Sequence, residues 1–170
     1  PRGAATASGC NNAQLAGVAD WRLDETMTGI DAELLLYAQN GNRIAVLKRN
    51  GADHYTGQLS TGPDGLVKGH LGRDIDVAAG QKAAELCAVN ILGQIAAVTP
   101  LENVTTILKL TVLVASMPDF SEQHLVGNGA SELFINVLGN PAKHARAAFG
   151  VSALPLGAAV EIDAVVEIAG

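Results

Sequence analysis

A long amphipathic segment between Asp76 and Pro100 is the feature that most restricts the fold of this chain. Proline is absent from it, and apolar residues recur at helical spacing along one face: Ala84, Cys87, Ala88, Ile91, Leu92, Ile95 and Val98. The segment that follows, residues 103–116, is rich in β-branched side chains and has the pattern of a largely buried strand. The sequence therefore predicts a long helix followed by a buried strand.

Shorter elements surround this unit. Three β-like runs in residues 43–72 are divided by Asn-Gly and by TGPDG, which predicts an antiparallel meander. Residues 121–139 favour a second helix that is interrupted near Gly127 and Gly129, and two apolar strands follow. Residues 31–39 favour a short helix, because acidic residues precede three leucines. The order predicts an α+β domain with a mostly antiparallel sheet and two helices on one face.

Length and composition limit the classes of function. The 170 residues suit one domain, which we place at 42–170, after an N-terminal extension at 1–41 that ends in the possible short helix. With 11 basic and 17 acidic residues and no basic cluster, the chain lacks the charge pattern of a nucleic-acid-binding protein. No apolar run reaches the ~20 residues of a membrane span, and no signal peptide is evident at the N-terminus. We therefore expect a cytoplasmic protein without membrane or nucleic-acid partners.

Metal and disulfide sites are not expected either. Cys10 and Cys87 form neither a disulfide framework nor a metal-binding spacing. The four histidines show neither HxH nor HExxH spacing. We interpret Cys87, on the apolar face of the first helix, as a small core residue. The spacing of these residues thus indicates neither a metal site nor a disulfide framework.

The segment HARAAFGVSALPLGAAVEI, residues 144–162, carries Arg146 on its first apolar strand and Glu161 on its second. Charged residues are seldom buried unless they are paired. One interpretation is a surface ion pair between the strands, contributing about 0–1 kcal/mol. The other is a site in which the planar guanidinium binds a substrate carboxylate and the glutamate positions or deprotonates a water.

The register of a simple hairpin predicts where these charges lie. A turn centred on residues 154–155 places Arg146 opposite Asp163 and Ala148 opposite Glu161. Residues that face each other across two strands project from the same side of the sheet. We therefore expect the arginine and the carboxylates on one face, with the apolar alternate residues of both strands facing the helices.

Four segments of the chain resemble a known family. They are TGQLSTGPDGLVKGHLG (56–72), ELCAVNILGQI (85–95), KLTVLVASMPDF (109–120) and HARAAFGVSALPLGAAVEIDA (144–164). Together they are similar to the reactive-intermediate deaminase family, also called Rid, YjgF or endoribonuclease L-PSP, in its longer-chain branch. An arginine followed fifteen residues later by a glutamate, with Leu-Pro between them, is a fairly specific part of the resemblance.

The resemblance implies a chorismate-mutase-like fold, assembled as a homotrimer with ligand clefts between adjacent subunits. In catalytic members it implies hydrolysis of small 2-imino acids or their enamine tautomers, such as 2-aminoacrylate, to 2-keto acids and ammonia without a cofactor. The alternative is a non-catalytic trimer that binds small carboxylates or keto acids as a regulator. Endoribonuclease activity or translation inhibition, attributed to some members, fits poorly with an acidic chain that lacks a basic or aromatic stripe.

The resemblance also assigns individual residues. Arg146 matches the family arginine that binds the carboxylate, and Glu161 matches the glutamate associated with the water. Thr56 and Gly57 match a Ser-Gly pair that lines the cleft. Asn128 matches a cleft asparagine. An enzyme with these residues in its site is the interpretation we favour.

Four further residues complete the candidate site. Ala148 stands at the family's small thiol position, where the backbone carbonyl is the group implicated. Tyr55 is a candidate for stacking on the ligand, with an ordinary half-buried strand tyrosine as the alternative. His144 lies near enough in sequence to Arg146 to line the cleft, with an ordinary strand-edge residue as the alternative. Asp163, which faces Arg146 in the predicted register, would hold or compete for its guanidinium.

Overall fold

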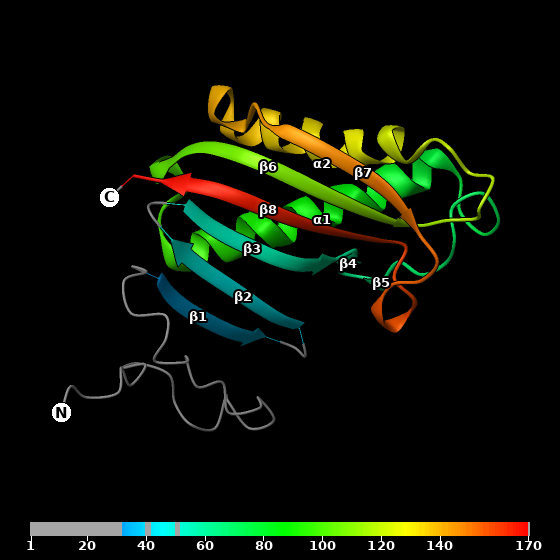
Figure 1. Cartoon of the computed structure of the whole chain (residues 1–170), viewed down its shortest axis with the longest axis horizontal. Helices are drawn as coiled ribbons and strands as arrows, with labels where there is room; N and C mark the ends of the chain where they lie inside the picture. The colour runs from blue at the N-terminus through cyan, green and yellow to red at the C-terminus, as the bar shows by residue number, and fades with distance from the viewer. Residues whose placement is uncertain (1–31, 40–41, 50–51, 170) are drawn as a thin grey trace.

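Six strands form the main sheet in the order β1-β2-β3-β8-β6-β7, and both long helices lie on one of its faces (Figure 1). The computed structural model describes residues 32–39, 42–49 and 52–169. The strands of this sheet are β1 (Ala32–Gln39), β2 (Asn42–Arg49), β3 (Ala52–Leu59), β6 (Val104–Ala115), β7 (Ala145–Val151) and β8 (Val160–Ile168). The helices are α1 (Val77–Val98) and α2 (Gln123–Leu138). The predicted α+β class, with two helices on one face of a mostly antiparallel sheet, is confirmed.

Short elements connect these parts. A small second sheet pairs β4 (Thr61–Gly62) with β5 (Gly65–Leu66). The 3-10 turns within the described residues are η3 (Leu101–Asn103), η4 (Asn140–Ala142) and η5 (Pro155–Gly157). The first two lead into β6 and β7, and η5 lies between β7 and β8.

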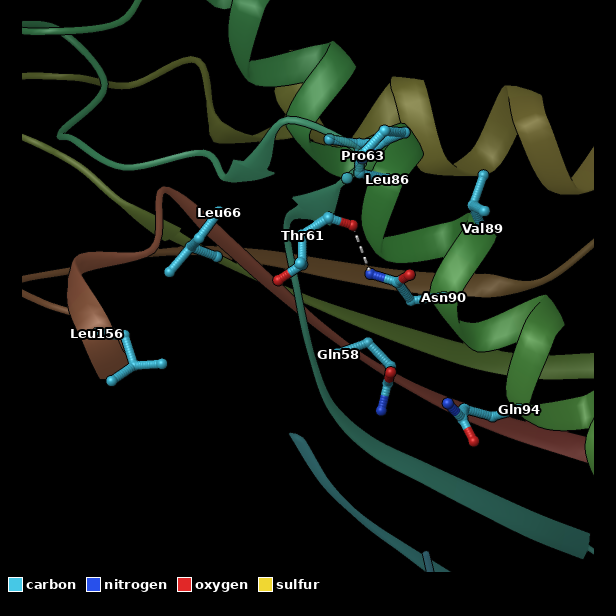
Figure 2. Close-up of a pocket in the computed structure, with 10 residues that line it drawn as sticks. Gln58, Thr61, Pro63, Leu66, Leu86, Val89, Asn90, Gln94 and Leu156 are labelled. Atoms are coloured by element: carbon cyan, nitrogen blue, oxygen red, sulfur yellow. Dashed lines mark hydrogen bonds between the residues drawn. The ribbon is translucent and has the colours of Figure 1, made fainter. Parts of the chain in front are cut away.

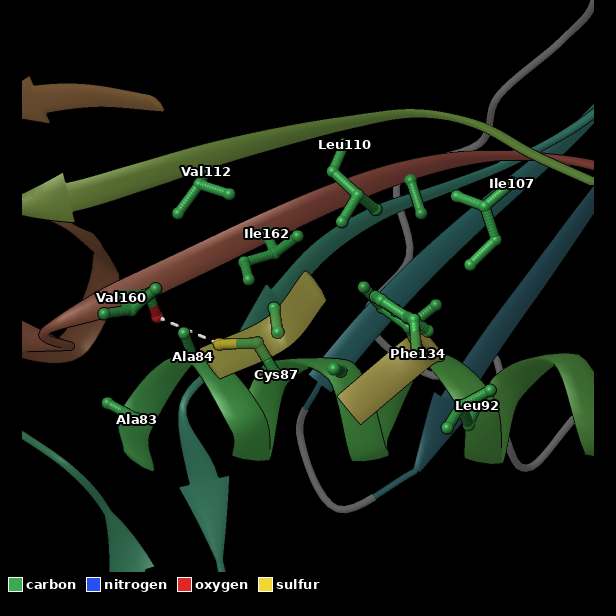
Figure 3. Packing of buried hydrophobic residues seen from close by; sticks show 14 of the residues in the cluster. Ala83, Ala84, Cys87, Leu92, Ile107, Leu110, Val112, Phe134, Val160 and Ile162 are labelled. Atoms are coloured by element: carbon green, nitrogen blue, oxygen red, sulfur yellow. Dashed lines mark hydrogen bonds between the residues drawn. The ribbon is translucent and has the colours of Figure 1, made fainter. Parts of the chain in front are cut away.

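The core lies between the helices and the sheet (Figure 3). The Asp76 side chain caps α1 by accepting the Ala79 N–H at 2.8 Å. Apart from Val98, which is half-buried, the predicted apolar face of α1 is fully buried against the sheet. The buried Cys87 thiol donates to the carbonyl of Val160 on β8 at 3.5 Å, and burial raises the pKa of this thiol. The predictions of a long helix, a buried strand and a structural cysteine are confirmed.

The predicted interruption of the second helix is wrong, because α2 runs without a break from Gln123 to Leu138. Its glycines permit close packing instead. A β-carbon at Gly129 would lie 2.1 Å from the carbonyl oxygen of Gln81 on α1. A larger residue would therefore push the two helices apart.

The helix predicted for residues 31–39 is also wrong, because residues 32–39 form β1 and pair along their whole length with β2. Intrinsic helix propensity is small per residue, so the hydrogen bonds and packing of a paired strand can override it. Asn40 and Gly41 lie between the two strands in sequence, and this dipeptide is a strong hairpin signal. The predicted extension 1–41 thus contributes a strand to the sheet. Residues 1–31 lie outside the described residues.

The predicted meander is confirmed in part. β2 and β3 pair antiparallel, from Val46 with Tyr55 to Arg49 with Ala52. The third run, residues 66–72, does not continue this sheet. It contributes the end of β5 and an isolated bridge to the residues before β8.

The predicted hairpin of β7 and β8 is wrong, because β6 lies between them. The chain leaves β6, forms α2 on one face, and returns as β7 parallel to β6. Parallel neighbours require this kind of helical crossover. Residues 152–159 then carry the chain past β6 to β8, which pairs antiparallel with β6 on its other side. The short connection between β7 and β8 therefore crosses a strand rather than forming a tight turn.

This arrangement separates the predicted charge pair. Leu110 on β6 is paired with Arg146 on one side and with Ala164 on the other, whereas Leu113 is paired with Phe149 and Glu161. Paired residues project from the same face. The arginine therefore lies on the helix-facing side of the sheet, and the glutamate lies on the open side.

The alternate residues of β7 are reversed in the same way. Phe149, predicted to face the helices, lies on the open side and is 51% exposed. Ala148, predicted to lie opposite Glu161, instead aligns through β6 with Ile162 and packs against the core. The facing of β8 itself is as predicted, since Val160 and Ile162 are buried.

Candidate functional site

Arg146 on β7 is held against α2 by three hydrogen bonds. Its Nη1 donates to Ser131 Oγ at 2.8 Å. Its Nη2 donates to the carbonyl oxygen of His124 and to Asn128 Oδ1, both at 3.0 Å. These bonds use three of the five N–H groups of the guanidinium, which leaves two for a ligand. The side chain is half-buried on the edge strand of the sheet.

Ser131 joins Arg146 to His144. The serine Oγ lies 3.0 Å from His144 Nε2, and His144 Nδ1 donates to the carbonyl of Ala142. The ring of His144 also packs edge-on against Phe134, with the centroids 6.5 Å apart. Burial lowers the pKa of His144, and the nearby charge of Arg146 lowers it further, against the effect of the Ala142 carbonyl. The neutral imidazole is therefore the favoured form.

A second polar group lies on the open side of the sheet. The register between β3 and β8 shifts after Tyr55, and Gly57 adopts φ +67° there. The N–H of Gly57 donates to Asp163 Oδ1 at 2.7 Å. A β-carbon at this glycine would lie 3.2 Å from Glu161 Oε1. Burial raises the pKa of Glu161, and the charge of Asp163 raises it further.

The candidate residues thus form two groups. Arg146, Asn128 and His144 lie together between β7 and α2. Gly57 lies with Glu161 and Asp163 on the other face. The predicted contact of Asp163 with Arg146 is wrong, since Asp163 binds the backbone of β3. Within one protomer, the two groups face opposite sides of the sheet.

Three candidates have no described side-chain contact in either group. The backbones of Tyr55 and Thr56 belong to β3, and their side chains lie outside the described residues. Ala148 is on β7, two residues from Arg146 and on the same side. Its small side chain packs on the core next to the arginine site.

Ser131 was not predicted from the sequence. It follows Asn128 by three residues, so in a continuous helix both side chains lie on one face. The expected break at Gly127 and Gly129 hid this periodicity. With α2 unbroken, the carbonyl of His124, Asn128 and Ser131 follow one another along the helix toward Arg146.

A separate cavity of about 490 Å³ opens between the end of β3 and α1 (Figure 2). Asn90 lines this cavity, and its Nδ2 donates hydrogen bonds to the carbonyls of Leu59 and Thr61, both at 3.0 Å. The lining is apolar or carries neutral polar groups: Gln58, Thr61, Gly62, Pro63, Leu66, Leu86, Val89, Asn90, Gln94 and Leu156. No charged side chain is among these residues, so the cavity lacks a direct partner for a carboxylate.

In the described part of the chain, no group of three or more His, Cys, Asp or Glu side chains is arranged to hold a metal ion. Over the same ranges, no helix is long and apolar enough to cross a membrane.

The fold and the matched sequence place this protein in the endoribonuclease L-PSP family, the Rid or YjgF family. The model of that family matches residues 40–168. The resemblance predicted from sequence motifs is confirmed.

Individual proteins are similar to this chain in sequence or in fold. Protein TCP17 of Trypanosoma cruzi is 46% identical over 118 residues, which cover 68% of this chain and 74% of that protein. A solved structure of a protein of unknown function from Agrobacterium tumefaciens is 50% identical and has a TM-score of 0.70, covering 72% of this chain and 81% of that one. A putative endoribonuclease from Shewanella oneidensis shares the fold, with 22% identity and a TM-score of 0.72, covering 79% and 90%.

Proposed function

We propose that this protein hydrolyses small 2-imino acids or their enamine tautomers to 2-keto acids and ammonia, at sites completed by a second copy of the chain. The observation that carries the proposal is Arg146, held in one orientation at the sheet edge with two N–H groups left for a ligand. Membership of the Rid family supports the same class of reaction.

Arg146 would bind the carboxylate of the substrate. A guanidinium N–H and a carboxylate form a short charge-assisted hydrogen bond, and the N–H groups left here are those of Nε and one of Nη1. Because α2 already fixes the guanidinium, the ligand does not have to order a flexible side chain. Gly127 lies beside it, since a β-carbon added there would lie 3.4 Å from the guanidinium.

Glu161 would activate the attacking water by accepting one of its protons. Its raised pKa brings proton exchange closer to neutral pH than in an ordinary glutamate. The water oxygen bonds to C2 of the imine while one water proton passes to Glu161. That proton then moves to the imine nitrogen as the C=N double bond becomes single, which gives a carbinolamine. The hydroxyl proton of the carbinolamine next passes through Glu161 to the same nitrogen, the C–N bond breaks as the C=O bond forms, and ammonia leaves. No oxidant or reductant is needed.

Two copies of the chain are needed for this site, because Arg146 and Glu161 of one protomer lie on opposite faces of the sheet. Among the described strands, β7 lies at one edge of the sheet. A neighbouring copy whose open sheet face lies against this edge would bring its carboxylates toward the arginine. A homotrimer, which the family resemblance implies, would provide such contacts with closed symmetry.

The test is turnover of a 2-imino acid generated in place by an amino-acid oxidase, with ammonia release as the readout. We expect Arg146→Ala to lower kcat/KM by about 10²-fold or more, because it removes a charged binding partner. Arg73→Ala is the matched control, since Arg73 is exposed and pairs with Asp74 at 2.8 Å away from this site. Equal ammonia release by wild type and Arg146→Ala would contradict the proposal.

A regulatory carboxylate-binding protein is the second candidate. It is favoured by one observation, that the Arg146 group is complete within a single protomer whereas Glu161 lies on the other face. In that case calorimetric titration with 2-ketobutyrate would show binding that depends on Arg146 but not on Glu161→Gln. Turnover would be absent from all variants.

A further inference from the structure

Ser131 on α2 and His144, the residue before β7, form a hydrogen-bonded pair, and the serine of this pair accepts a hydrogen bond from Arg146. We infer that this pair consists of positioning residues, which fix the guanidinium in the orientation that receives a carboxylate. The inference rests on the proposed carboxylate-binding role of Arg146 and adds two residues that this role does not itself require.

The direction of the hydrogen bonds carries the inference. His144 uses its Nδ1–H on the Ala142 carbonyl, so Nε2 of the neutral ring is an acceptor. A serine hydroxyl has one proton, and Nε2 is the acceptor that takes it. The lone pairs of Ser131 Oγ are then left for Arg146 Nη1, 2.8 Å away. Every donor in this chain of bonds has one acceptor, which strengthens each bond.

The pair also completes a set of anchors on one side of the guanidinium. The His124 carbonyl, Asn128 and Ser131 lie four and three residues apart on α2, so they present acceptors along one face. Of these, the serine is the one that reaches Nη1, whereas the other two both bind Nη2. Loss of the serine would therefore leave the guanidinium free to rotate about a single nitrogen.

His144 is itself held in place. Phe134 packs edge-on against its ring at an interplanar angle of 78°, and the Ala142 carbonyl fixes its other nitrogen. It precedes Arg146 by two residues, which places both side chains on the same side of the chain. The imidazole thus has a defined orientation, in which its Nε2 accepts the hydroxyl proton of Ser131.

The main test compares Ser131→Ala with Ser131→Thr in two measurements on the full chain. Titration with 2-ketobutyrate reports carboxylate binding, and NMR of the Arg146 Nη–H and His144 ring nitrogens reports the hydrogen bonds directly. We expect Ser131→Ala to weaken 2-ketobutyrate binding about tenfold, because one hydrogen bond to a charged group is lost. Ser131→Thr keeps the hydroxyl and should restore binding to within about threefold of wild type.

In turnover, Ser131→Ala should raise KM while kcat changes less than about twofold, because binding of the carboxylate is shared by ground state and transition state. A general loss of structure would instead lower the apparent kcat, by reducing the fraction of folded enzyme, and leave KM unchanged. Alanine is the better helix former, so α2 should persist in this variant. His144→Phe provides a second variant, which keeps the contact with Phe134 and removes the acceptor. It should weaken binding about threefold.

Three results are distinguishable. The positioning role would be supported if Ser131→Ala loses the NMR signals of the hydrogen-bonded Arg146 Nη–H groups and binds 2-ketobutyrate more weakly. Ser131→Thr should restore both. Unchanged NMR signals and unchanged affinity in both Ser131→Ala and His144→Phe would overturn it. If wild type binds no 2-ketobutyrate while the NMR signals still depend on Ser131, the proposed function fails and the fixing of Arg146 stands.

Discussion

The two faces of the sheet hold their charged groups in different ways. On the helix-facing side, Arg146 has three acceptors within 3.0 Å, all supplied by α2 of the same chain. On the open side, Glu161 and Asp163 make no ion pair with any residue from 57 to 169, and Asp163 accepts a backbone N–H. The arginine is therefore preorganised within the protomer. The carboxylates are the groups whose environment a neighbouring copy would change most.

The largest expected effect comes from mixing two inactive variants. We expect Arg146→Ala and Glu161→Gln each to lose about 10²-fold in imine turnover. If each site takes its arginine from one copy and its glutamate from the next, co-refolding equal amounts should restore about a quarter of wild-type activity, by random assembly of a closed ring. Ammonia release from the refolded mixture is the measurement. Activity that stays at the level of the separate variants would place both residues of the site in one chain.

On the helix-facing side, Gly129→Ala should destabilise the fold by about 3 kcal/mol, because the new β-carbon would overlap the Gln81 carbonyl of α1. Gly93→Ala is the matched control. A β-carbon at Gly93 meets nothing within 4 Å, so this helix position should gain about 0.5–1 kcal/mol. Urea unfolding of both variants measures the difference. Similar stabilities for the two would mean that the helices can separate without cost.

On the open side, Glu161→Gln should raise the stability relative to wild type, and this gain should be larger at neutral pH than at acidic pH. The folded pKa of Glu161 is raised above its ordinary 4.5, so its contribution to stability is complete below that value and falls as the pH rises through the folded pKa. Glutamine does not ionise and avoids this loss. Melting temperatures of wild type and variant from pH 4 to pH 8 provide the test. Parallel curves would show that the open face does not disfavour the glutamate charge.

The smallest effect concerns His144. Its folded pKa is lowered from 6.5, so its contribution to stability is complete above that value and is lost as the pH falls toward the folded pKa. His144→Phe should therefore reduce the pH dependence of the free energy of unfolding below pH 6.5. Denaturant unfolding at a series of pH values measures this slope. An unchanged slope would exclude His144 as the group that titrates there.

The sequence was sufficient where the signal is local. The periodicity of Ala84 to Ile95 and the β-branched run from Val104 were enough to predict α1 and β6, and the motif around Arg146 was enough to predict the family. The partners of β7 and β8 were beyond local patterns. A short connection favours a hairpin, but the crossover through α2 places β6 between them. The side of the sheet on which Arg146 lies depends on this strand order, and so does its contact with Ser131.

The position of β8 in the sheet has a consequence for synthesis on the ribosome. β8 joins β3 to β6, yet it follows both in the chain, and about a hundred residues separate it from β3. Until residues 160–168 emerge, the strand that pairs with both β3 and β6 is missing, so any partial sheets of β1-β2-β3 and β6-β7 would have unpaired edges. Closure over so long a loop is slow, and unpaired edges favour aggregation. A truncation before Val160 should therefore produce an insoluble chain rather than a smaller folded domain.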